Sequence, residues 1–273
     1  MEDLKIRRLA VIGAGKMGEA LVSSLVGSGV IKAGNVVATA RHRESLERFE
    51  RNFGIETTLD NRQAVDSAEV ILLCVKPQVA QTVIEEVNDL LGPDQVLLSI
   101  IAGLTTRMMD EQLDNNVPVV RAMPNTPSRI GSGMTAVCGG RWAKPEHVEM
   151  GRALFSRVGR SLILDEKYFD AVTGVSGSGP AFIYVVIEAM AEGGVKMGLP
   201  RNVATELAAQ TCLGAAQMVI EKGAHPALLK DEVTTPAGCT VDGLLKLEEG
   251  GLRVTLIKAI VEAGRRAGEL VDD

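Results

Sequence analysis

Aromatic residues and histidine are scarce in this chain of 273 residues, and positive charge is not in excess. Phe, Trp and Tyr make up 3% of the sequence, whereas alanine and glycine are abundant, so we expect helices that pack closely through small residues. The 29 Lys and Arg against 35 Asp and Glu give a net charge of -6. Binding to a phosphate backbone needs a basic face, so this balance argues against a nucleic-acid partner.

The chain also lacks the patterns of a metal site, a disulfide framework or a membrane protein. Its four cysteines form no C-x-x-C pair, which predicts reduced structural thiols in a cytosolic protein: Cys74, Cys138, Cys212 and Cys239. The three histidines are equally scattered, so neither a zinc site nor a Ser-His-Asp triad is expected. No uninterrupted apolar run approaches the ~18 residues that span a bilayer, and the first residues lack a secretory pattern. We therefore expect a cytoplasmic protein without membrane contact.

The first half of the chain alternates short apolar runs with amphipathic segments. The strand-like runs are LAVIG from residue 9, NVVATA from 35, EVILLCV from 69, QVLLSIIAG from 95, VPVVRAMPN from 117, GMTAVCGG from 133 and RSLILD from 160. The third run is apolar almost throughout, as expected for a strand that is covered on both faces. Repeated βα units predict an α/β domain with a doubly wound, mostly parallel sheet.

The pattern changes after about Leu164. Three long helical patterns follow, two of them opened by proline, which is favoured at the first helical position. We therefore predict that residues 1–164 form the α/β domain and that residues 165–273 form an all-helical domain. A helical domain this rich in small apolar residues has surface to bury, so we expect a homodimer through it; packing within one chain is the alternative.

The first βα unit carries a glycine motif, VIGAGKMGEAL, with Gly13, Gly15 and Gly18 in G-x-G-x-x-G spacing. Gly13 permits a tight turn, Gly15 lets backbone approach a pyrophosphate, and Gly18 lets helix and strand pack closely. The helix that follows offers free N–H groups to an anion. This context predicts a Rossmann-like dinucleotide-binding domain, with a purely structural glycine turn as the alternative.

The end of the second strand indicates which dinucleotide binds. An NAD site usually places an acid there for the ribose 2′-hydroxyl, but the sequence VATARHRE has no acid before Glu44. Arg41 and Arg43 stand near that place, and arginine suits a 2′-phosphate. We therefore expect NADPH, with NADH as the second option. A solvated loop charge is the alternative for Arg41.

Later strand ends offer further ligand contacts, because ligands bind at the carboxyl ends of parallel strands. In CVKPQ, either the Lys76 side chain or the backbone of Val75 and Lys76 would contact a cofactor phosphate or ribose. In MPNTP, Asn125 is flanked by prolines and would hold a nicotinamide or a substrate group. A plain turn residue is an equally good interpretation of Asn125.

Two stretches of the second half suit a substrate. In DEVTTPAGCTVDGLL, a turn at Pro236 precedes a helical pattern, and its free N–H groups can hold a carboxylate without a basic side chain. Thr240 adds a hydroxyl there, and its alternative role is to cap the helix. In VSGSGPAF, Pro180 opens the first long helix, while Ser176 and Ser178 cap that helix or line the pocket near Thr240. The G-x-S-x-G spacing of a nucleophile turn fails at Ser178.

Seven motifs in this order and spacing extend over essentially the whole chain: VIGAGKMGEAL, CVKPQ, MPNTP, AVTGVSGSGPAF, GGVKMGLPR, HPALLKDEVTTPAGCTVDGL and LEEGGLR. On these motifs the chain resembles the pyrroline-5-carboxylate reductase family. The resemblance implies reduction of the C=N bond of 1-pyrroline-5-carboxylate to L-proline with NADPH or NADH. It also implies a Rossmann-like domain followed by a helical dimerisation domain, often assembled into a decamer.

The resemblance assigns roles to residues. It implies that backbone and hydroxyl groups of one loop hold the substrate carboxylate: Val233, Thr234, Thr235, Pro236, Ala237, Gly238 and Cys239. It implies that Thr240 contacts the ring nitrogen and is a candidate proton donor. Cofactor contacts are implied for Ile12, Gly13, Ala14, Gly15, Lys16, Met17, Asn61, Cys74, Val75, Lys76, Pro77, Ile100, Ile101 and Ala102. Many members have Asn or Gln in place of Glu232 and an acid in place of Gly223, so we assign neither residue to the site.

Two other functions compete with this interpretation. A β-hydroxyacid dehydrogenase, or a related reductase on the same plan, would use a lysine on the helix after a GxxGxG stretch. The first lysine of the corresponding helix here is Lys196, which lies far along it. A non-catalytic NAD(P)-binding regulator would be expected to have a degenerate substrate loop, whereas the loop TTPAGCT keeps the residue types that a substrate loop needs.

Overall fold

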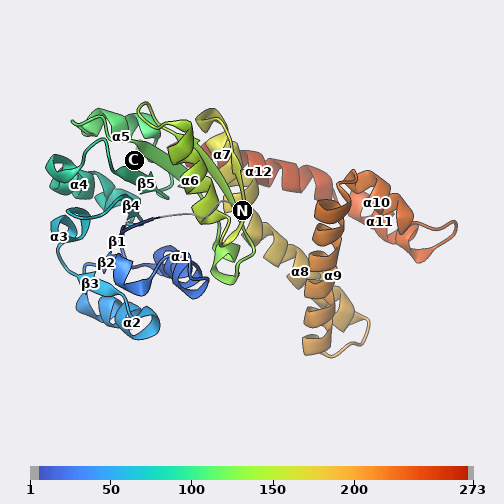
Figure 1. The fold of residues 1–273 in the computed structure, drawn as a ribbon. Coiled ribbons are helices and arrows are strands. Elements are labelled where there is room, and N and C mark those ends of the chain that lie inside the picture. The colour runs from blue at the N-terminus through green and yellow to red at the C-terminus, as the bar shows by residue number, and fades with distance from the viewer. Residues whose placement is uncertain (1–5, 270–273) are drawn as a thin grey trace. The chain divides into compact units, whose positions relative to one another are not determined.

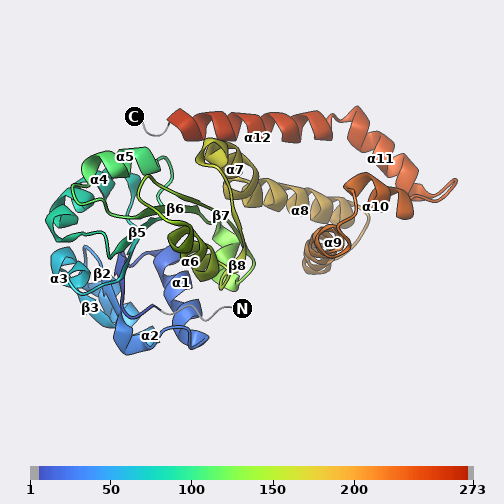
Figure 2. The ribbon, with the colours of Figure 1, turned by 45° about the horizontal axis from the view of Figure 1, so that its top comes forward.

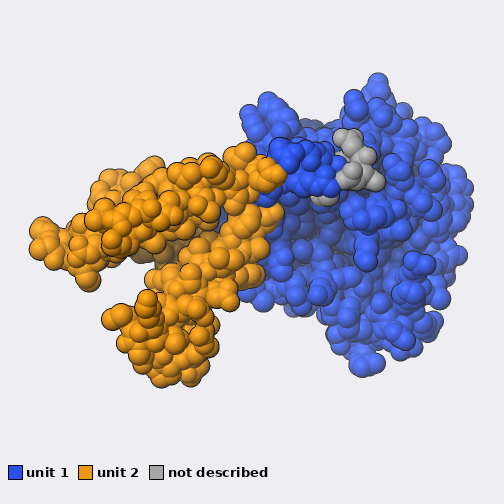
Figure 3. Space-filling view, turned by 180° about the vertical axis from the view of Figure 1, so that it is seen from behind, with its two compact units in different colours: residues 1–177, 263–273 blue, residues 178–262 orange. Residues whose placement is uncertain are grey.

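The computed structural model describes residues 6–269. The chain divides into two compact units, residues 1–177 with 263–273 and residues 178–262 (Figures 1 and 3). The expected domain boundary after residue 164 stays a prediction.

Unit 1 is built on one eight-stranded sheet of order β3-β2-β1-β4-β5-β6-β7-β8. The strands are β1 (Leu9–Ile12), β2 (Val36–Thr39), β3 (Glu56–Thr58), β4 (Val70–Leu73), β5 (Val96–Ser99), β6 (Val119–Met123), β7 (Gly133–Gly139) and β8 (Gly159–Ile163). All neighbouring strands are parallel except β6 and β7, which pair antiparallel. The mostly parallel, doubly wound sheet expected from the sequence is therefore confirmed.

Helices cover both faces of this sheet (Figure 2). Alternate strand residues separate the two layers: Val11 and Leu72 pack toward one face, and Ile12 and Leu73 toward the other. The first face is covered by α1 (Lys16–Gly27), α2 (Arg43–Phe53) and α6 (Pro145–Phe155). The second is covered by α3 (Asn61–Val65), α4 (Pro77–Val87) and α5 (Thr106–Gln112). Burial on both faces explains why the central strands are apolar at nearly every position.

Unit 1 also contains the connection that leads toward the long helices. It consists of a 3₁₀ turn (Glu166–Tyr168), the short helix α7 (Phe169–Val172) and a π-helical turn (Thr173–Gly177). π-Helical turns are rare in proteins, and those that do occur are often found at functional sites. The other 3₁₀ turns of the unit are Ala33–Asn35, Asn88–Leu90 and Thr126–Ile130.

Unit 2 is helical, as expected. It holds α8 (Gly179–Lys196), α9 (Arg201–Lys222), α10 (Pro226–Glu232), α11 (Cys239–Glu249) and the first part of α12 (Leu252–Glu269). α8 and α9 pack through small residues: Ala191 and Ala208 are buried between them, and a Cβ at Gly194 would lie 3.0 Å from that of Ala204. The expected close packing of small residues is present in this helix pair.

Much of the apolar surface of these helices is exposed in the single chain. Val185 on α8, Leu207 on α9 and Val261 on α12 are each more than half exposed. By length and composition alone, the helical stretches Glu166–Lys196 and Arg201–Lys222 would suffice to cross a membrane, contrary to our expectation from the apolar runs. That criterion is weak, and contiguous exposed apolar surface is also typical of a face that a protein partner covers.

Candidate active site

The Gly-rich loop lies where the strand order reverses. β1 has β2 on one side and β4 on the other, and ligands of doubly wound sheets bind outside the carboxyl ends of the strands at such a point. Three predicted cofactor segments, residues 12–18, 74–77 and 100–102, include or follow the ends of β1, β4 and β5. These strands are neighbours, so the fold gathers the three segments at one edge of the sheet.

Close backbone packing requires two of the three glycines. Gly13 has φ +98°, and a Cβ there would lie 2.9 Å from the carbonyl carbon and oxygen of Cys74. A Cβ at Gly18 would lie 3.1 Å from the Gly13 carbonyl oxygen, which shows how tightly α1 packs against the loop. At Gly15 no atom of the described chain lies within 4 Å of such a Cβ. In the dinucleotide-binding fingerprint, the pyrophosphate contacts the backbone at this second glycine, where the absence of a side chain leaves space for it.

The N-terminus of α1 suits an anion. Its N-cap residue is Gly15, which has no side chain to bond the first N–H groups of the helix, so these groups are available to a ligand. The helix dipole also favours negative charge at this end. Gly13 and Ala14 donate their N–H groups to the carbonyl oxygen of Thr39 at 3.1 and 2.7 Å. These bonds tie the loop to the end of β2. The arrangement fits the pyrophosphate of a dinucleotide.

The end of β2 carries basic side chains. Arg41 and Arg43 are both exposed just beyond this strand, where an acid would stand in an NAD site. The Thr39 hydroxyl donates to Oδ1 of Asn61 at 2.7 Å, and Nδ2 of Asn61 donates to Glu86 at 2.8 Å. Asn61, at the start of α3, is thereby held at the end of β2 with the other predicted cofactor residues.

The loops after β4 and β5 are joined to the strands beside them. The N–H of Cys74 donates to the Ile12 carbonyl at 2.8 Å, and the N–H of Ile100 donates to the Leu73 carbonyl at 3.2 Å. Burial raises the pKa of the Cys74 thiol well above its usual range, so this thiol stays protonated and uncharged. Lys76 is exposed at the N-cap of α4, where an ammonium group can reach a phosphate.

The Asn125 side chain holds two backbone segments. Its Nδ2 donates to the carbonyl of Ser176 at 2.9 Å, and its Oδ1 accepts from the N–H of Met134 at 2.9 Å. Both ends of the amide are therefore engaged inside the protein. This geometry favours the turn role over the contact with nicotinamide or substrate, which stays a prediction.

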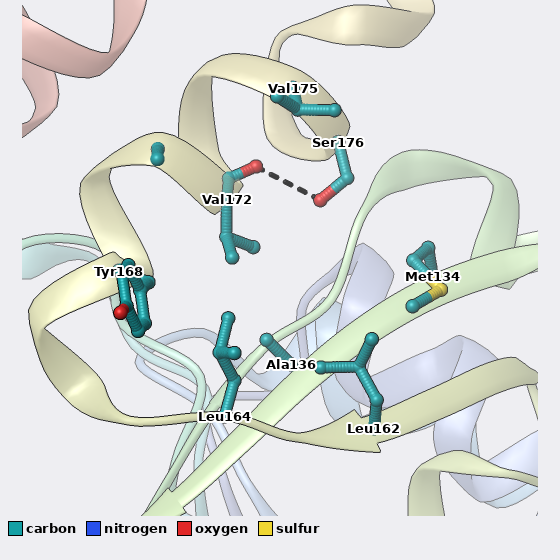
Figure 4. Close-up of a pocket in the computed structure, with 9 residues that line it drawn as sticks. Met134, Ala136, Leu162, Leu164, Tyr168, Val172, Val175 and Ser176 are labelled. Carbon is teal, nitrogen blue, oxygen red and sulfur yellow. Dashed lines mark hydrogen bonds between the residues drawn. The ribbon is translucent and has the colours of Figure 1, made fainter.

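An apolar pocket of about 410 Å³ lies beside Ser176 (Figure 4). The Ser176 hydroxyl donates to the carbonyl of Val172 at 3.0 Å, and Ser178 stands at the N-cap of α8 without a side-chain bond. Ser178 thus occupies the expected N-cap position, but neither serine side chain makes a capping bond, and Ser176 bonds back along its own helix. Pro180 is the second residue of α8. Their roles as substrate contacts stay predictions.

The predicted substrate loop in unit 2 contains a tight turn. The N–H of Gly238 donates to the carbonyl of Thr235 at 2.9 Å, and Pro236 and Ala237 form the corners. Ala237 has φ +58°, a left-handed conformation that glycine or asparagine usually adopts at this position. A Cβ at Gly238 would lie 2.4 Å from the Thr235 hydroxyl oxygen. Such locally strained backbone is found preferentially at functional sites.

Thr240 lies directly after this turn, as the second residue of α11. The N-cap residue is Gly238, so the alternative that Thr240 caps the helix is wrong: α11 begins at Cys239. The Thr240 hydroxyl forms no hydrogen bond within residues 6–269. The hydroxyl of Thr234, in contrast, donates to the Lys230 carbonyl at 2.8 Å. Thr240 thus presents a hydroxyl beside the free N–H groups of a helix N-terminus.

The structure gathers the predicted residues into two groups. The segments expected to bind the cofactor lie in unit 1 and residues 233–240 lie in unit 2. Sequence reasoning missed Thr39, which accepts two N–H groups of the Gly-rich loop and positions Asn61. The sequence does place Thr39 at the end of the second strand, but its hydrogen-bond partners in the Gly-rich loop and at Asn61 can be identified only once the strand pairing is known.

This geometry defines a class: an oxidoreductase that binds a nicotinamide dinucleotide on a Rossmann-like sheet and carries a separate helical unit. Residues 8–103 match the family described as NADP oxidoreductase, coenzyme F420-dependent. Residues 166–270 match the family described as pyrroline-5-carboxylate reductase dimerisation.

Full-length relatives specify the family. A pyrroline-5-carboxylate reductase of Arabidopsis thaliana is 42% identical over 96% of this chain and 95% of its own length. A solved pyrroline-5-carboxylate reductase of Coxiella burnetii is 33% identical with a TM-score of 0.91 over 97% of this chain and 99% of its own. A solved pyrroline carboxylate reductase of Plasmodium falciparum with NADP bound is 28% identical, with a TM-score of 0.86 over 97% and 98%. This chain belongs to the pyrroline-5-carboxylate reductase family and is an NAD(P)H-dependent reductase.

The family, fold class, enzyme class and nicotinamide cofactor expected from the sequence are thereby confirmed. The likeness extends over nearly the whole of both chains, so it includes the cofactor loop and the Thr240 turn. Individual residue roles are not tested by these matches and stay predictions.

Gly15→Ala separates cofactor binding from folding. Its backbone has φ -94° and its surroundings are open, so alanine should leave the unfolding midpoint unchanged. The added methyl would stand where the pyrophosphate meets the backbone, so we expect the Kd for NADPH to rise about tenfold, measured by titration calorimetry. Gly27→Ala in α1, also open, is the matched control. Unaltered NADPH affinity in Gly15→Ala would leave the loop as a structural turn.

Proposed function

We propose that this chain reduces 1-pyrroline-5-carboxylate to L-proline, that it prefers NADPH to NADH, and that Thr240 acts at the substrate nitrogen. The observation that carries the proposal is the strained turn of residues 235–238 followed by a helix N-terminus with an unengaged hydroxyl. The substrate combines a carboxylate with a cyclic imine, and this loop offers a group for each.

The cofactor cradle explains how unit 1 would hold NADPH. The N–H groups at the start of α1 would bind the pyrophosphate over Gly15, and Arg41 would bind the 2′-phosphate through charge-assisted hydrogen bonds. When bound, reduced nicotinamide supplies the hydride. The protein must then hold the acceptor and manage one proton.

The turn in unit 2 explains how the substrate would be held. Backbone N–H groups at the start of α11 suit a carboxylate, because the helix dipole favours negative charge there. The Thr235 hydroxyl can add a further hydrogen bond, whereas the Thr234 hydroxyl would first have to release the Lys230 carbonyl. No basic side chain is required, which is consistent with a sequence that has none between Lys230 and Lys246.

Thr240 would orient and relay the proton. An imine accepts hydride best when its nitrogen is protonated, and a neutral hydroxyl can hydrogen-bond that nitrogen. Because a threonine hydroxyl is a very weak acid, water is the ultimate proton source in this proposal. The role requires a hydroxyl that is not committed elsewhere in the chain, and that of Thr240 meets this condition within the described residues.

The match of residues 166–270 to a dimerisation family supports a homo-oligomer formed through the helical domain. The exposed apolar faces of α8, α9 and α12 supply surface for it. A dimer is the basic unit in this proposal, and a decamer would need a second contact that joins such dimers. We further propose cytoplasmic location and a domain boundary after residue 164, close to the start of the family match.

The decisive assay follows NADPH absorbance after addition of 1-pyrroline-5-carboxylate, with NADH in parallel. We expect oxidation with both cofactors, faster with NADPH at low concentration, and proline as the product. Pure, folded protein that binds NADPH but gives a flat trace would instead support a non-catalytic regulator.

Thr240→Ala should lower kcat by about 100-fold, the lower range for loss of a general acid–base group. NADPH affinity should change little, because Thr240 lies outside the cofactor cradle of unit 1. Thr240→Ser keeps the hydroxyl and is expected to retain most of the activity. Steady-state kinetics check this, and an unchanged kcat in Thr240→Ala would remove the residue from the mechanism.

Arg41→Ala should raise the Kd for NADPH about tenfold, the size expected for loss of a hydrogen bond between charged groups. The Kd for NADH should stay the same, because NADH has no 2′-phosphate. Arg51→Ala, exposed on α2, is the matched control and should affect neither. Equal weakening of both cofactors in Arg41→Ala would disprove the assignment to the 2′-phosphate.

Sedimentation velocity tests the assembly. We expect a dimer or a multiple of it at micromolar concentration, because large apolar faces of single chains tend to be covered. A stable monomer under these conditions would contradict the proposed role of the helical domain.

A further inference from the structure

A buried ion pair lies behind one of the cofactor loops. Arg121 on β6 is 4% exposed, and its Nη1 donates to Oε1 of Glu166 at 2.8 Å. The guanidinium also stands over the Phe169 ring, 4.8 Å from its centroid. Its Nε has no hydrogen-bond partner in the described part of the chain. Glu166 is therefore the carboxylate on which this buried charge depends.

Glu166 also holds the start of α5. Its Oε1 accepts from the backbone N–H of Thr106 at 2.8 Å, and its Oε2 accepts from the Thr106 hydroxyl. Thr106 is the first residue of α5, so its N–H has no partner within the helix. One carboxylate thus joins β6, α5 and the connection that begins at Glu166.

The loop between β5 and α5 is one of the segments expected to contact the cofactor. It leaves β5 at Ser99 and reaches α5 at Thr106, and residues 100–102 lie within it. The loop ends at Thr106, and within it Ala102 packs against the hydrophobic cluster that contains Phe169. Glu166 and its neighbours therefore support this loop without belonging to it.

The sheet order indicates which half of the cofactor would contact this loop. Arg41 follows β2, on one side of β1, whereas β4 and β5 lie on the other side. A dinucleotide that crosses the switch point with its 2′-phosphate at Arg41 directs its nicotinamide half toward β4 and β5.

We infer that Glu166 is a positioning residue for the nicotinamide half of the cofactor, acting through Thr106 on the loop of residues 100–102. This inference rests on the proposed function for the placement of the 2′-phosphate at Arg41. It predicts that the two ligands respond differently: variants of Glu166 lose affinity for NADPH but keep their affinity for a fragment that lacks nicotinamide.

The test compares NADPH with 2′-phospho-ADP, which is NADPH without its nicotinamide riboside, by titration calorimetry. Glu166→Gln removes the charge and weakens the bonds to Thr106, so the Kd for NADPH should rise about tenfold. The Kd for 2′-phospho-ADP should stay within about twofold, because this fragment is held at the α1 N-terminus and Arg41. Arg41→Ala should weaken both ligands.

Two further variants keep the test decisive. Glu149→Gln, which removes the charge of a half-buried carboxylate paired with Arg152, should change neither affinity. If Glu166→Gln does not fold, Thr106→Val is the substitute, because it removes one bond to Glu166 and leaves the pair of Glu166 with Arg121 intact. In Thr106→Val the Kd for NADPH should rise about threefold and the Kd for 2′-phospho-ADP should not change. Equal loss for both ligands, or no loss for either, would overturn the inference. If Glu166→Gln weakens only NADPH but the wild-type protein does not reduce 1-pyrroline-5-carboxylate, only the proposed function is overturned.

Discussion

The cofactor site depends on how closely the loop after β1 approaches the end of β4. The Cβ of any side chain at Gly13 would overlap the backbone of Cys74, and backbone cannot move aside as a flexible side chain can. This contact lets the N–H groups of Gly13 and Ala14 reach the carbonyl of Thr39, which ties β1, β2 and β4 into one edge. The start of α1 then faces that edge with its N–H groups uncapped. A side chain at Gly13 would therefore disturb three strand ends together.

A second constraint holds the connection that leads into the helical unit. Glu166 pairs with a buried guanidinium and bonds a helix N-terminus with one carboxylate, and Asn125 holds the carbonyl of Ser176 at the other end of the connection. Both anchors are partly buried polar groups, for which a lost partner costs more than in water. The connection of residues 166–177 is thus held near both ends.

The accuracy of sequence-based prediction varied with the length of each element. Seven of the eight strands were expected, because a buried parallel strand is an apolar run that stands out. β3 was missed since Glu56, Thr57 and Thr58 have no apolar side chain and pair along one side only. The short helices α3 and α5 were missed for a related reason: each buries only two residues, too few for a periodic signal.

The sequence by itself determined the fold class, the dinucleotide fingerprint and the family, because glycine spacing, apolar runs and contiguous motifs are local properties of the chain. Tertiary structure alone decided the remaining features. It brought Thr39 to the Gly-rich loop, turned the Asn125 amide toward Ser176, and placed Glu166 between Arg121 and Thr106. These partners are separated by many residues, and their hydrogen bonds depend on strand order and helix ends. No spacing rule along the chain contains that information.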